Sequence, residues 1–356
     1  MNLKKLFKLW NVSLLLICLC GITACQSKIN IDIEQQADEY LIDLANEDEF
    51  SGSVLIAHQG EIVFKKGYGY ADKENEILNS PQTKFQIASI TKQITALAIL
   101  QLQEQGKLAV QDPACEYISG CPSPWEEITI HHLLTHSSGL PPAMGFGLEP
   151  SNLVEGYQDV VLDFKPGEDF QYSNVGYMVL GLVIENVSGQ TYENYLQENI
   201  FEPLNLSSTG LTLEDNDIAV GYNPWGSEAP VLDPEKNLSA AGLYSTVEDL
   251  FALWDQIFHD NNLITEDSLS SMVSASNPIP PDQLTLWEGD WAYGYAWFVG
   301  EENGRGIYTH GGIAQGISAN ISYYPEQEIT IIILSNREDA PKFDIQAELS
   351  KQIFGE

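Results

Sequence analysis

Residues 89–92 read Ser89-Ile90-Thr91-Lys92, the one Ser-x-x-Lys of the chain, and they open an apolar segment that runs to Gly106. Apolar residues recur in it at helical spacing, which predicts a helix over about Ser89–Gln105 that Gly106 closes. Three residues along a helix turn about 300° and rise about 4.5 Å, so Ser89 and Lys92 share one face. The stretch therefore predicts a hydroxyl beside an amine at a helix N-terminus.

Such a pair has a defined chemical use. An ammonium beside a hydroxyl in a partly desolvated cleft binds its proton less tightly. The amine then helps to take the serine proton as the serine attacks a carbonyl carbon. Unpaired N–H groups at the helix N-terminus favour a developing oxyanion. The structural alternative is a surface serine and lysine one turn apart.

Outside this helix, strand patterns lie near both ends of the chain. We expect these strands to form one antiparallel sheet in an α+β fold (an α/β sandwich), with helices on its faces and a large helical insertion. The α/β part spans about 30–108 and 286–356, and the helical part about 109–285. The expected strands are Ser53–Ala57, Ile62–Lys66, Tyr293–Val299, Gly306–Thr309, Gly316–Tyr323 and Ile329–Leu334. Further helices are expected at about 31–47 and 341–354, and at Asp249–Phe258 after a capping box at Ser245–Glu248.

The first 24 residues have the pattern of a secretory signal. An almost unbroken apolar run, Trp10–Cys20, follows three lysines, and Ile22-Thr23-Ala24-Cys25 resembles a bacterial lipobox. We therefore expect an exported protein of the bacterial cell envelope, lipid-anchored to the membrane through Cys25. The alternatives are an uncleaved anchor or an ordinary signal that is cut nearby. Residues 25–356 would form the mature domain.

The charge of the chain limits its partners. It carries 16 Lys and Arg against 51 Asp and Glu, a net charge of −35. Such a surface repels phosphate backbones, so a nucleic-acid partner is excluded. We expect a small-molecule or peptide substrate, with membrane contact only through the lipid anchor.

Cysteines and histidines offer few metal ligands. Cys115 and Cys121 enclose a short segment, and in an exported protein they could form a disulfide or remain free thiols. His131, His132 and His136 cluster in sequence, but this spacing does not put three ligands on one helical face. We interpret the histidines as structural and expect no metal.

Two further motifs accompany the Ser-x-x-Lys. Tyr172-Ser173-Asn174 follows a Pro166-Gly167 turn, and His310-Gly311-Gly312 lies on a late strand. In this order the three motifs resemble those of the serine β-lactamase and D,D-peptidase superfamily, which are Ser-x-x-Lys, Tyr-x-Asn and Lys/His-x-Gly. The resemblance covers about residues 45–340. It includes Gly67–Asp72, Phe85–Ala88, Leu133–Leu140 and Ala241–Thr246.

The resemblance implies roles for these residues. Ser89 would be the nucleophile that forms an acyl-enzyme, while Lys92 and Tyr172 would share the acid–base work, with the first base left open. Asn174 would hold Lys92 and the substrate amide. His310 would line the cleft and keep Tyr172 in the right protonation state.

The remaining implied roles concern the backbone. Gly312 would let the edge strand approach the substrate closely. The N–H groups of Ser89 and Ile313 would form the oxyanion hole. No metal or cofactor is implied.

Other matches to these motifs have simpler interpretations. Tyr192-Glu193-Asn194 lies in an amphipathic helix, so we interpret Tyr192 as core packing, and His58-Gln59-Gly60 fits a hairpin turn. One aromatic group would form either a wall of the active site or part of the core: Trp287, Trp291, Tyr295 and Trp297.

The His-Gly-Gly motif bears on specificity. Relatives in class C of the β-lactamases carry Lys-Thr-Gly there, so His310 exchanges a fixed cation for a mostly neutral imidazole. Substrates with a carboxylate would then be poorly attracted. We expect ester or amide hydrolysis first, D,D-carboxypeptidase or D-amino-acid peptidase activity second, and weak β-lactamase activity third. A non-catalytic binding or sensing protein on the same fold is the alternative from another class.

Overall fold

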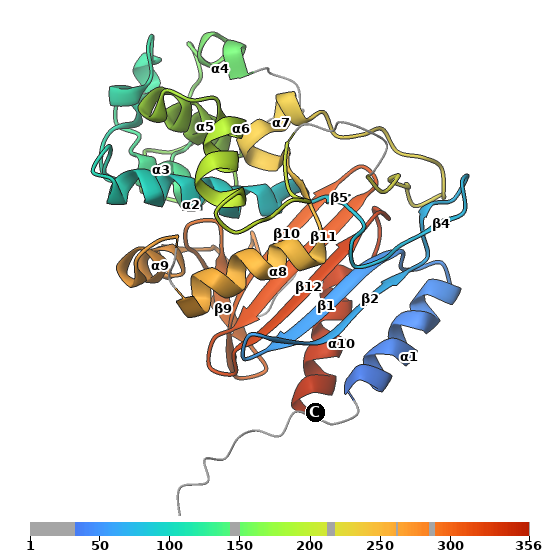
Figure 1. The fold of residues 1–356 in the computed structure, drawn as a ribbon. Coiled ribbons are helices and arrows are strands. Elements are labelled where there is room, and N and C mark those ends of the chain that lie inside the picture. The colour runs from blue at the N-terminus through green and yellow to red at the C-terminus, as the bar shows by residue number, and fades with distance from the viewer. Residues whose placement is uncertain (1–32, 143–149, 212–217, 261–262, 285–288, 356) are drawn as a thin grey trace, which may run out of the picture.

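The computed structural model describes residues 33–142, 150–211, 218–260, 263–284 and 289–355. At its centre lies an eight-stranded antiparallel sheet in the order β2-β1-β12-β11-β10-β9-β8-β7 (Figure 1). Strand β1 pairs with β12, so the two ends of the chain share one sheet, as the sequence predicts. The strands are β1 (Gly52–His58), β2 (Glu61–Tyr68), β7 (Asn277–Pro278), β8 (Ala292–Tyr293), β9 (Phe298–Glu302), β10 (Arg305–Ala314), β11 (Ile317–Tyr324) and β12 (Ile329–Ser335).

Helices cover both faces of this sheet. The terminal helices α1 (Ile33–Asn46) and α10 (Lys342–Phe354) lie on one face, and α8 (Val247–Asp255) lies on the other (Figure 1). Side chains alternate along a strand, so neighbouring residues of β1 face opposite sides of the sheet. Val54 packs on the side covered by α1 and α10, and Leu55 packs on the side covered by α8. Strand β1 is therefore buried from Gly52 to Ala57.

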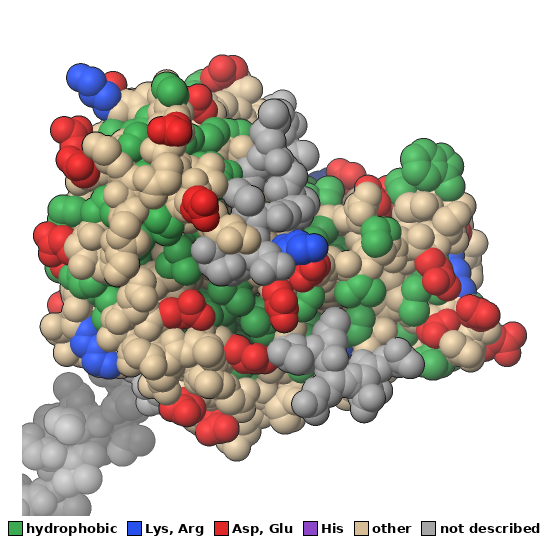
Figure 2. All heavy atoms as spheres, turned by 90° about the horizontal axis from the view of Figure 1, so that it is seen from above, with side chains coloured by type: hydrophobic (Ala, Val, Ile, Leu, Met, Phe, Trp, Pro, Cys, Tyr) green, Lys and Arg blue, Asp and Glu red, His purple; other side chains and the backbone are tan. Residues whose placement is uncertain are grey.

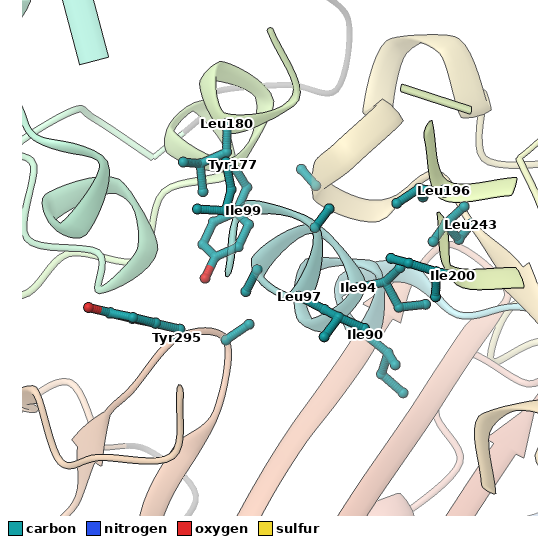
Figure 3. Close-up of a cluster of buried hydrophobic side chains, with 14 of the residues drawn as sticks. Ile90, Ile94, Leu97, Ile99, Tyr177, Leu180, Leu196, Ile200, Leu243 and Tyr295 are labelled. Carbon is teal, nitrogen blue, oxygen red and sulfur yellow. The ribbon is translucent and has the colours of Figure 1, made fainter. Parts of the chain in front are cut away.

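The helical part packs around α2 (Thr91–Glu104), whose residues from Thr91 to Leu102 are all buried. Ile94, Leu97 and Ile99 of this helix face apolar side chains from several neighbouring elements (Figure 3). A helix buried on all sides needs no polar face, which fits the unbroken apolar run Ala96–Leu100. The helices α5 (Asn174–Ser188) and α7 (Pro234–Ala241) pack directly on α2. The other helices of this part are α3 (Ile130–Leu134), α4 (Pro150–Gly156), α6 (Tyr192–Leu196) and α9 (Glu266–Met272).

Short elements complete the fold. Two small sheets pair β3 (Tyr70–Asp72) with β4 (Ile77–Leu78), and β5 (Phe85–Gln86) with β6 (Tyr244–Ser245). The 3₁₀ helices are η1 (Ala88–Ile90), η2 (Ala114–Tyr117) and η3 (Ser123–Trp125), and π-helical turns are η4 (Gln197–Phe201) and η5 (Gln256–Asp260).

Several predicted boundaries were wrong for identifiable local reasons. The helix expected from Ser89 begins at Thr91, because Ala88 has φ +45° and the chain forms the tight turn η1 first. The strand expected over Tyr293–Val299 is two strands, β8 and β9, and Ala296 between them has φ +61°. Residues in the left-handed region interrupt regular hydrogen bonding, and the sequence pattern does not reveal them.

The predicted capping box also differs. Thr246, rather than Ser245, caps α8, since its side chain accepts a hydrogen bond from the N–H of Asp249. Helix α8 and strand β7 both fall in the range expected for the helical part, 109–285, yet α8 packs on the central sheet and β7 joins it. The helical part therefore supplies elements to the sheet layer.

Two sequence expectations concern features away from the sheet. A disulfide joins Cys115 and Cys121, with the Cα atoms 5.4 Å apart. Cys25 and the expected signal segment lie outside the described residues.

Within the described ranges, no helix has the length and apolar character needed to cross a bilayer. Acidic side chains are spread over the face shown in Figure 2.

Candidate active site

Ser89 lies on the turn η1, which two segments hold in place. Ile87 donates its N–H to the carbonyl of Leu243, next to the β5–β6 pair. On the other side, a Cβ on Gly312 would lie 2.2 Å from the carbonyl oxygen of Ile87. The glycine is therefore required so that β10 can pack against η1, which differs from the expectation that it admits the substrate. Ala88 keeps its left-handed conformation between these supports, at a cost of about 1–3 kcal/mol.

The ammonium of Lys92 lies beside the Ser89 hydroxyl. Its Nζ is 3.1 Å from Ser89 Oγ, 2.7 Å from Asn174 Oδ1 and 2.8 Å from the carbonyl oxygen of Ala240. These contacts join α2 to the first residue of α5 and to the end of α7. An ammonium has three donors, so each N–H has one acceptor.

All three acceptors of Lys92 are neutral oxygens, and the side chain is fully buried. Burial disfavours the charged form and holds the pKa of Lys92 well below its usual value. The amine thus loses its proton more readily than an exposed lysine, and its neutral form can accept one from a hydroxyl. Burial and neutral hydrogen-bond acceptors therefore give Lys92 the environment of the proton acceptor that the Ser-x-x-Lys motif predicts.

Tyr172 covers this pair from the other side. Its ring centroid lies 4.9 Å from Lys92 Nζ. Burial raises the pKa of Tyr172 above its ordinary value, and a hydrogen bond with Ser89 opposes that shift. The hydroxyl therefore stays protonated at neutral pH and can donate a proton.

His136 forms the support behind Tyr172. Its ring is 4.2 Å from the Tyr172 ring, and its Nδ1 accepts the N–H of Ser173 at 3.2 Å. Burial lowers the pKa of His136 well below its usual value, so the ring is neutral. The prediction that this histidine is structural thus holds in a particular sense, because it fixes the segment that carries Tyr172 and Asn174.

His310 is buried on β10, and two hydrogen bonds fix its ring. Nδ1 lies 2.8 Å from the carbonyl oxygen of Gly311, which only accepts, so this nitrogen carries the proton. Nε2 then accepts from the Tyr293 hydroxyl, also at 2.8 Å. Burial, followed by the charge of Lys92, lowers the pKa of His310 to about 3. The ring is 6.2 Å from that of Tyr172, between centroids, and it adds no cation to the site.

The segment of β10 beyond His310 borders the site. Pairing of β9 with β10 ends at Thr309, whereas β10 continues to Ala314 with β11 on its other side. Ile313 is 64% exposed and lies on this continuation. Among the described strands none pairs with that edge, so an extended substrate could bind along it.

A cavity of about 640 Å³ opens beside Ser89 and Tyr172. Its wall includes apolar side chains from several segments: Phe170, Ile279, Leu284 and Phe298. Lys342 and Phe343 of α10 line another part of the same cavity. This space fits a mainly apolar acyl or aryl group next to the hydroxyl of Ser89.

The remaining candidate residues are structural. Tyr192 is fully buried, with its hydroxyl 2.7 Å from Thr95 Oγ1. Trp297 packs against Trp254, with centroids 4.9 Å apart, and is core rather than cavity wall. The other aromatic candidates, Trp291 and Tyr295, are buried too, and Trp287 lies outside the described residues.

His131 and His132 have partners within the protein. His131 Nδ1 is 2.9 Å from the Tyr295 hydroxyl, and His132 forms a capping box with Thr129. No group of three His, Cys, Asp or Glu side chains that could hold a metal ion occurs in the part of the chain that the structure describes.

The sequence interpretation missed Lys342. Its Nζ donates to the carbonyl oxygen of Gly312, and burial lowers its pKa to about 7. In sequence this lysine is one residue of an amphipathic terminal helix. Only the packing of α10 beside β10 brings it to the site.

Fold and site define the class, a β-lactamase-fold protein with a Ser-x-x-Lys centre. The family model described as Beta-lactamase matches residues 37–353, and the chain belongs to this family of serine hydrolases.

Curated relatives agree. Protein flp of Staphylococcus aureus (strain N315) is 31% identical over 328 residues, which cover 87% of this chain and 64% of that protein. The chain thus spans about 64% of the length of that relative. The putative penicillin-binding protein PbpX of Bacillus subtilis (strain 168) is 32% identical over 320 residues, covering 88% of this chain and 76% of PbpX. Among solved structures, the octameric penicillin-binding protein homologue from Pyrococcus abyssi is similar, with a TM-score of 0.81 at 29% identity over 90% of this chain and 77% of that one.

Proposed function

We propose that this chain hydrolyses an ester or amide through an acyl-enzyme on Ser89. The observation that carries the proposal is the buried amine of Lys92, 3.1 Å from the Ser89 hydroxyl and bonded only to neutral oxygens. Such an amine, with its pKa held well below the usual value by burial, can take the serine proton. Lys92 rather than Tyr172 is therefore the first base, because the pKa of Tyr172 is raised.

In the first half of the reaction, the Ser89 oxygen bonds to the substrate carbonyl carbon as its proton passes to Lys92. The N–H groups of Ser89 and Ile313 stabilise the oxyanion. As the intermediate collapses, the bond to the alcohol or amine breaks. That leaving group takes a proton from Tyr172, which regains one from Lys92.

In the second half, water attacks the acyl carbon. Its proton goes to the same amine, and the Ser89 oxygen leaves with a proton as the acid is released. No step requires a metal or a redox partner. The cycle consumes one water and yields an acid with an alcohol or amine.

The cavity supports an uncharged, mainly apolar acyl group as the first choice of substrate. Its wall includes Phe170 and Phe298, and the neutral ring of His310 contributes no charge. A D-amino-acid peptide with a free carboxylate is the second candidate, because the ammonium of Lys342 lines the same cavity. β-Lactams rank third.

A panel of p-nitrophenyl esters, D-Ala-D-Ala peptides and nitrocefin separates these substrates. We expect the highest kcat/KM with an ester. Labelling by a fluorophosphonate and by a fluorescent penicillin tests the covalent step. Labelling by neither reagent, together with no turnover, would favour the non-catalytic binding protein.

We also propose that the protein is exported and that Cys25 carries a lipid. The support is the lipobox-like Ile22-Thr23-Ala24-Cys25 after an apolar run. Expression in a bacterium with radiolabelled palmitate should label the wild-type protein but not a Cys25→Ser variant. Equal labelling of both would refute the anchor.

A further inference from the structure

The ammonium of Lys342 donates a hydrogen bond to the carbonyl oxygen of Gly312. That carbonyl and the N–H of Ile313 belong to one planar trans peptide, so they point in opposite directions. We propose that Lys342 is a positioning residue, which orients and polarises the Gly312–Ile313 peptide so that its N–H stabilises the oxyanion formed at Ser89. The inference rests on the proposed hydrolase function and extends its oxyanion site to α10.

The position of Lys342 is fixed by the start of α10. The carbonyl of Ala340 accepts the N–H of Lys342 at 2.8 Å and the hydroxyl of Ser318, on β11, at 3.1 Å. The lysine is only 6% exposed. Its side chain is thus held against the sheet, beside β10, rather than free in solvent.

Gly311 leaves the space that this side chain uses. A Cβ on Gly311 would lie 2.9 Å from Phe343 Cζ and 3.4 Å from both Cε and Nζ of Lys342. A methyl group at position 311 would therefore displace the Phe343 ring, and a longer side chain would also reach the Lys342 ammonium. The His-Gly-Gly motif and Lys342 fit together as one unit.

The physical effect follows from the polarity of the peptide. In its charged form Lys342 makes a stronger hydrogen bond to the carbonyl than a neutral donor would, and it polarises the N–H at the other end of the peptide. Bonds in such chains strengthen one another by about 10–30%. Loss of a whole oxyanion donor costs about 10²–10³ in kcat, so loss of its support should cost less, about tenfold.

Lys342→Met removes the donor while keeping the length and apolar stem of the side chain. We expect kcat on a p-nitrophenyl ester to fall about tenfold, with KM within about twofold, because the peptide acts on the transition state. Lys342→Gln restores a neutral donor and should recover part of kcat. The control is Lys351→Met, an exposed lysine of the same helix with 49% side-chain exposure, which should match the wild type.

Gly311→Val provides a second route to the same test, and it keeps the lysine. Its γ-methyl groups extend beyond the Cβ, which already lies 3.4 Å from Lys342 Nζ, so they should displace the ammonium and lower kcat to a similar degree. The double variant that also carries Lys342→Met should show little further loss of kcat, because both changes remove the same interaction. Thermal unfolding of each variant shows whether it is folded.

The outcomes distinguish failure of the positioning role of Lys342 from failure of the hydrolase proposal. If the wild-type protein is labelled at Ser89 and hydrolyses the ester, yet folded Lys342→Met and Gly311→Val keep kcat within about twofold, the positioning role is wrong while the hydrolase stands. A raised KM at unchanged kcat in both Lys342→Gln and Lys342→Met would also overturn it. Absence of both labelling and turnover in the wild-type protein would overturn the hydrolase and this inference together.

Discussion

Asn174 Oδ1 accepts a hydrogen bond from Lys92 Nζ at 2.7 Å, although 82 residues separate the two in sequence. The contact joins the N-terminus of α5 to the first turn of α2, and thereby two of the three motifs. Asn174 is neutral, which keeps the amine without a counter-ion. The proposed role of Lys92 as a base depends on that neutrality.

Asn174→Asp tests this dependence. A carboxylate at the same distance favours the charged ammonium and raises the pKa of Lys92. Turnover at pH 7 should fall about tenfold or more and recover as the pH rises, so the optimum of the pH–rate profile moves upward. Asn194→Asp, at the exposed asparagine of the second Tyr-x-Asn, is the matched control. An unshifted profile in Asn174→Asp would argue against Lys92 as the base.

Tyr172→Phe keeps the ring and removes the proposed proton donor. We expect kcat to fall about 10²–10⁴-fold, the usual share of acid–base catalysis, with little change in stability. Tyr192→Phe should instead lower stability and leave kcat unchanged. It removes the hydroxyl that lies 2.7 Å from Thr95 Oγ1, while Thr95 keeps its hydrogen bond to the carbonyl oxygen of Ser239. The free energy of unfolding should therefore fall about 0.5–1.5 kcal/mol at an unchanged rate. Similar kinetics in the two variants would show that the wrong tyrosine has been assigned.

Gly312→Ala places a Cβ 2.2 Å from the carbonyl oxygen of Ile87. Strand β10 and the turn η1 must then separate, which moves Ser89 away from the N–H of Ile313. We expect kcat/KM to fall more than about 100-fold, as in the loss of an oxyanion donor. Gly306→Ala on the same strand meets no atom within 4 Å and should behave as the wild type. Wild-type activity in Gly312→Ala would contradict the assigned geometry.

The buried ring of His310 should make stability depend on pH. Its pKa is about 3 when folded, against about 6.5 when unfolded, because burial and Lys92 disfavour the charged ring. Below pH 6.5 the unfolded chain binds a proton that the folded one does not, so the free energy of unfolding falls as the pH drops towards 3.

The His310 contribution amounts to at most about 1.4 kcal/mol per pH unit and is fully present above pH 6.5. Denaturant unfolding at pH 4.5 and 7.5 should show a smaller difference in His310→Asn than in the wild type. An equal difference in both would mean that the ring is already charged in the folded state.

Much of the fold was predictable from the sequence. Apolar runs indicate strands near both ends of the chain, and these strands share one antiparallel sheet as expected, through the pairing of β1 with β12. The proximity of Ser89 and Lys92 follows from a spacing of three residues. These features depend on local pattern, which a single sequence records.

Other features depend on tertiary packing. The left-handed conformation of Ala88 is imposed by its neighbours and leaves no mark in an apolar run. Lys342 reaches the site because α10 begins beside β10, and nothing in its own helix indicates that contact. The support that His136 gives to Tyr172 had one signal, its place in the motif-like stretch Leu133–Leu140.

The most direct test of the central claim is the intact mass of the protein after brief reaction with a small fluorophosphonate. We predict a single adduct that peptide mapping assigns to Ser89, and no adduct in folded Ser89→Ala, which should also lose ester hydrolysis. An adduct on another residue, or hydrolysis by Ser89→Ala near the wild-type rate, would contradict the assignment of Ser89 as the nucleophile.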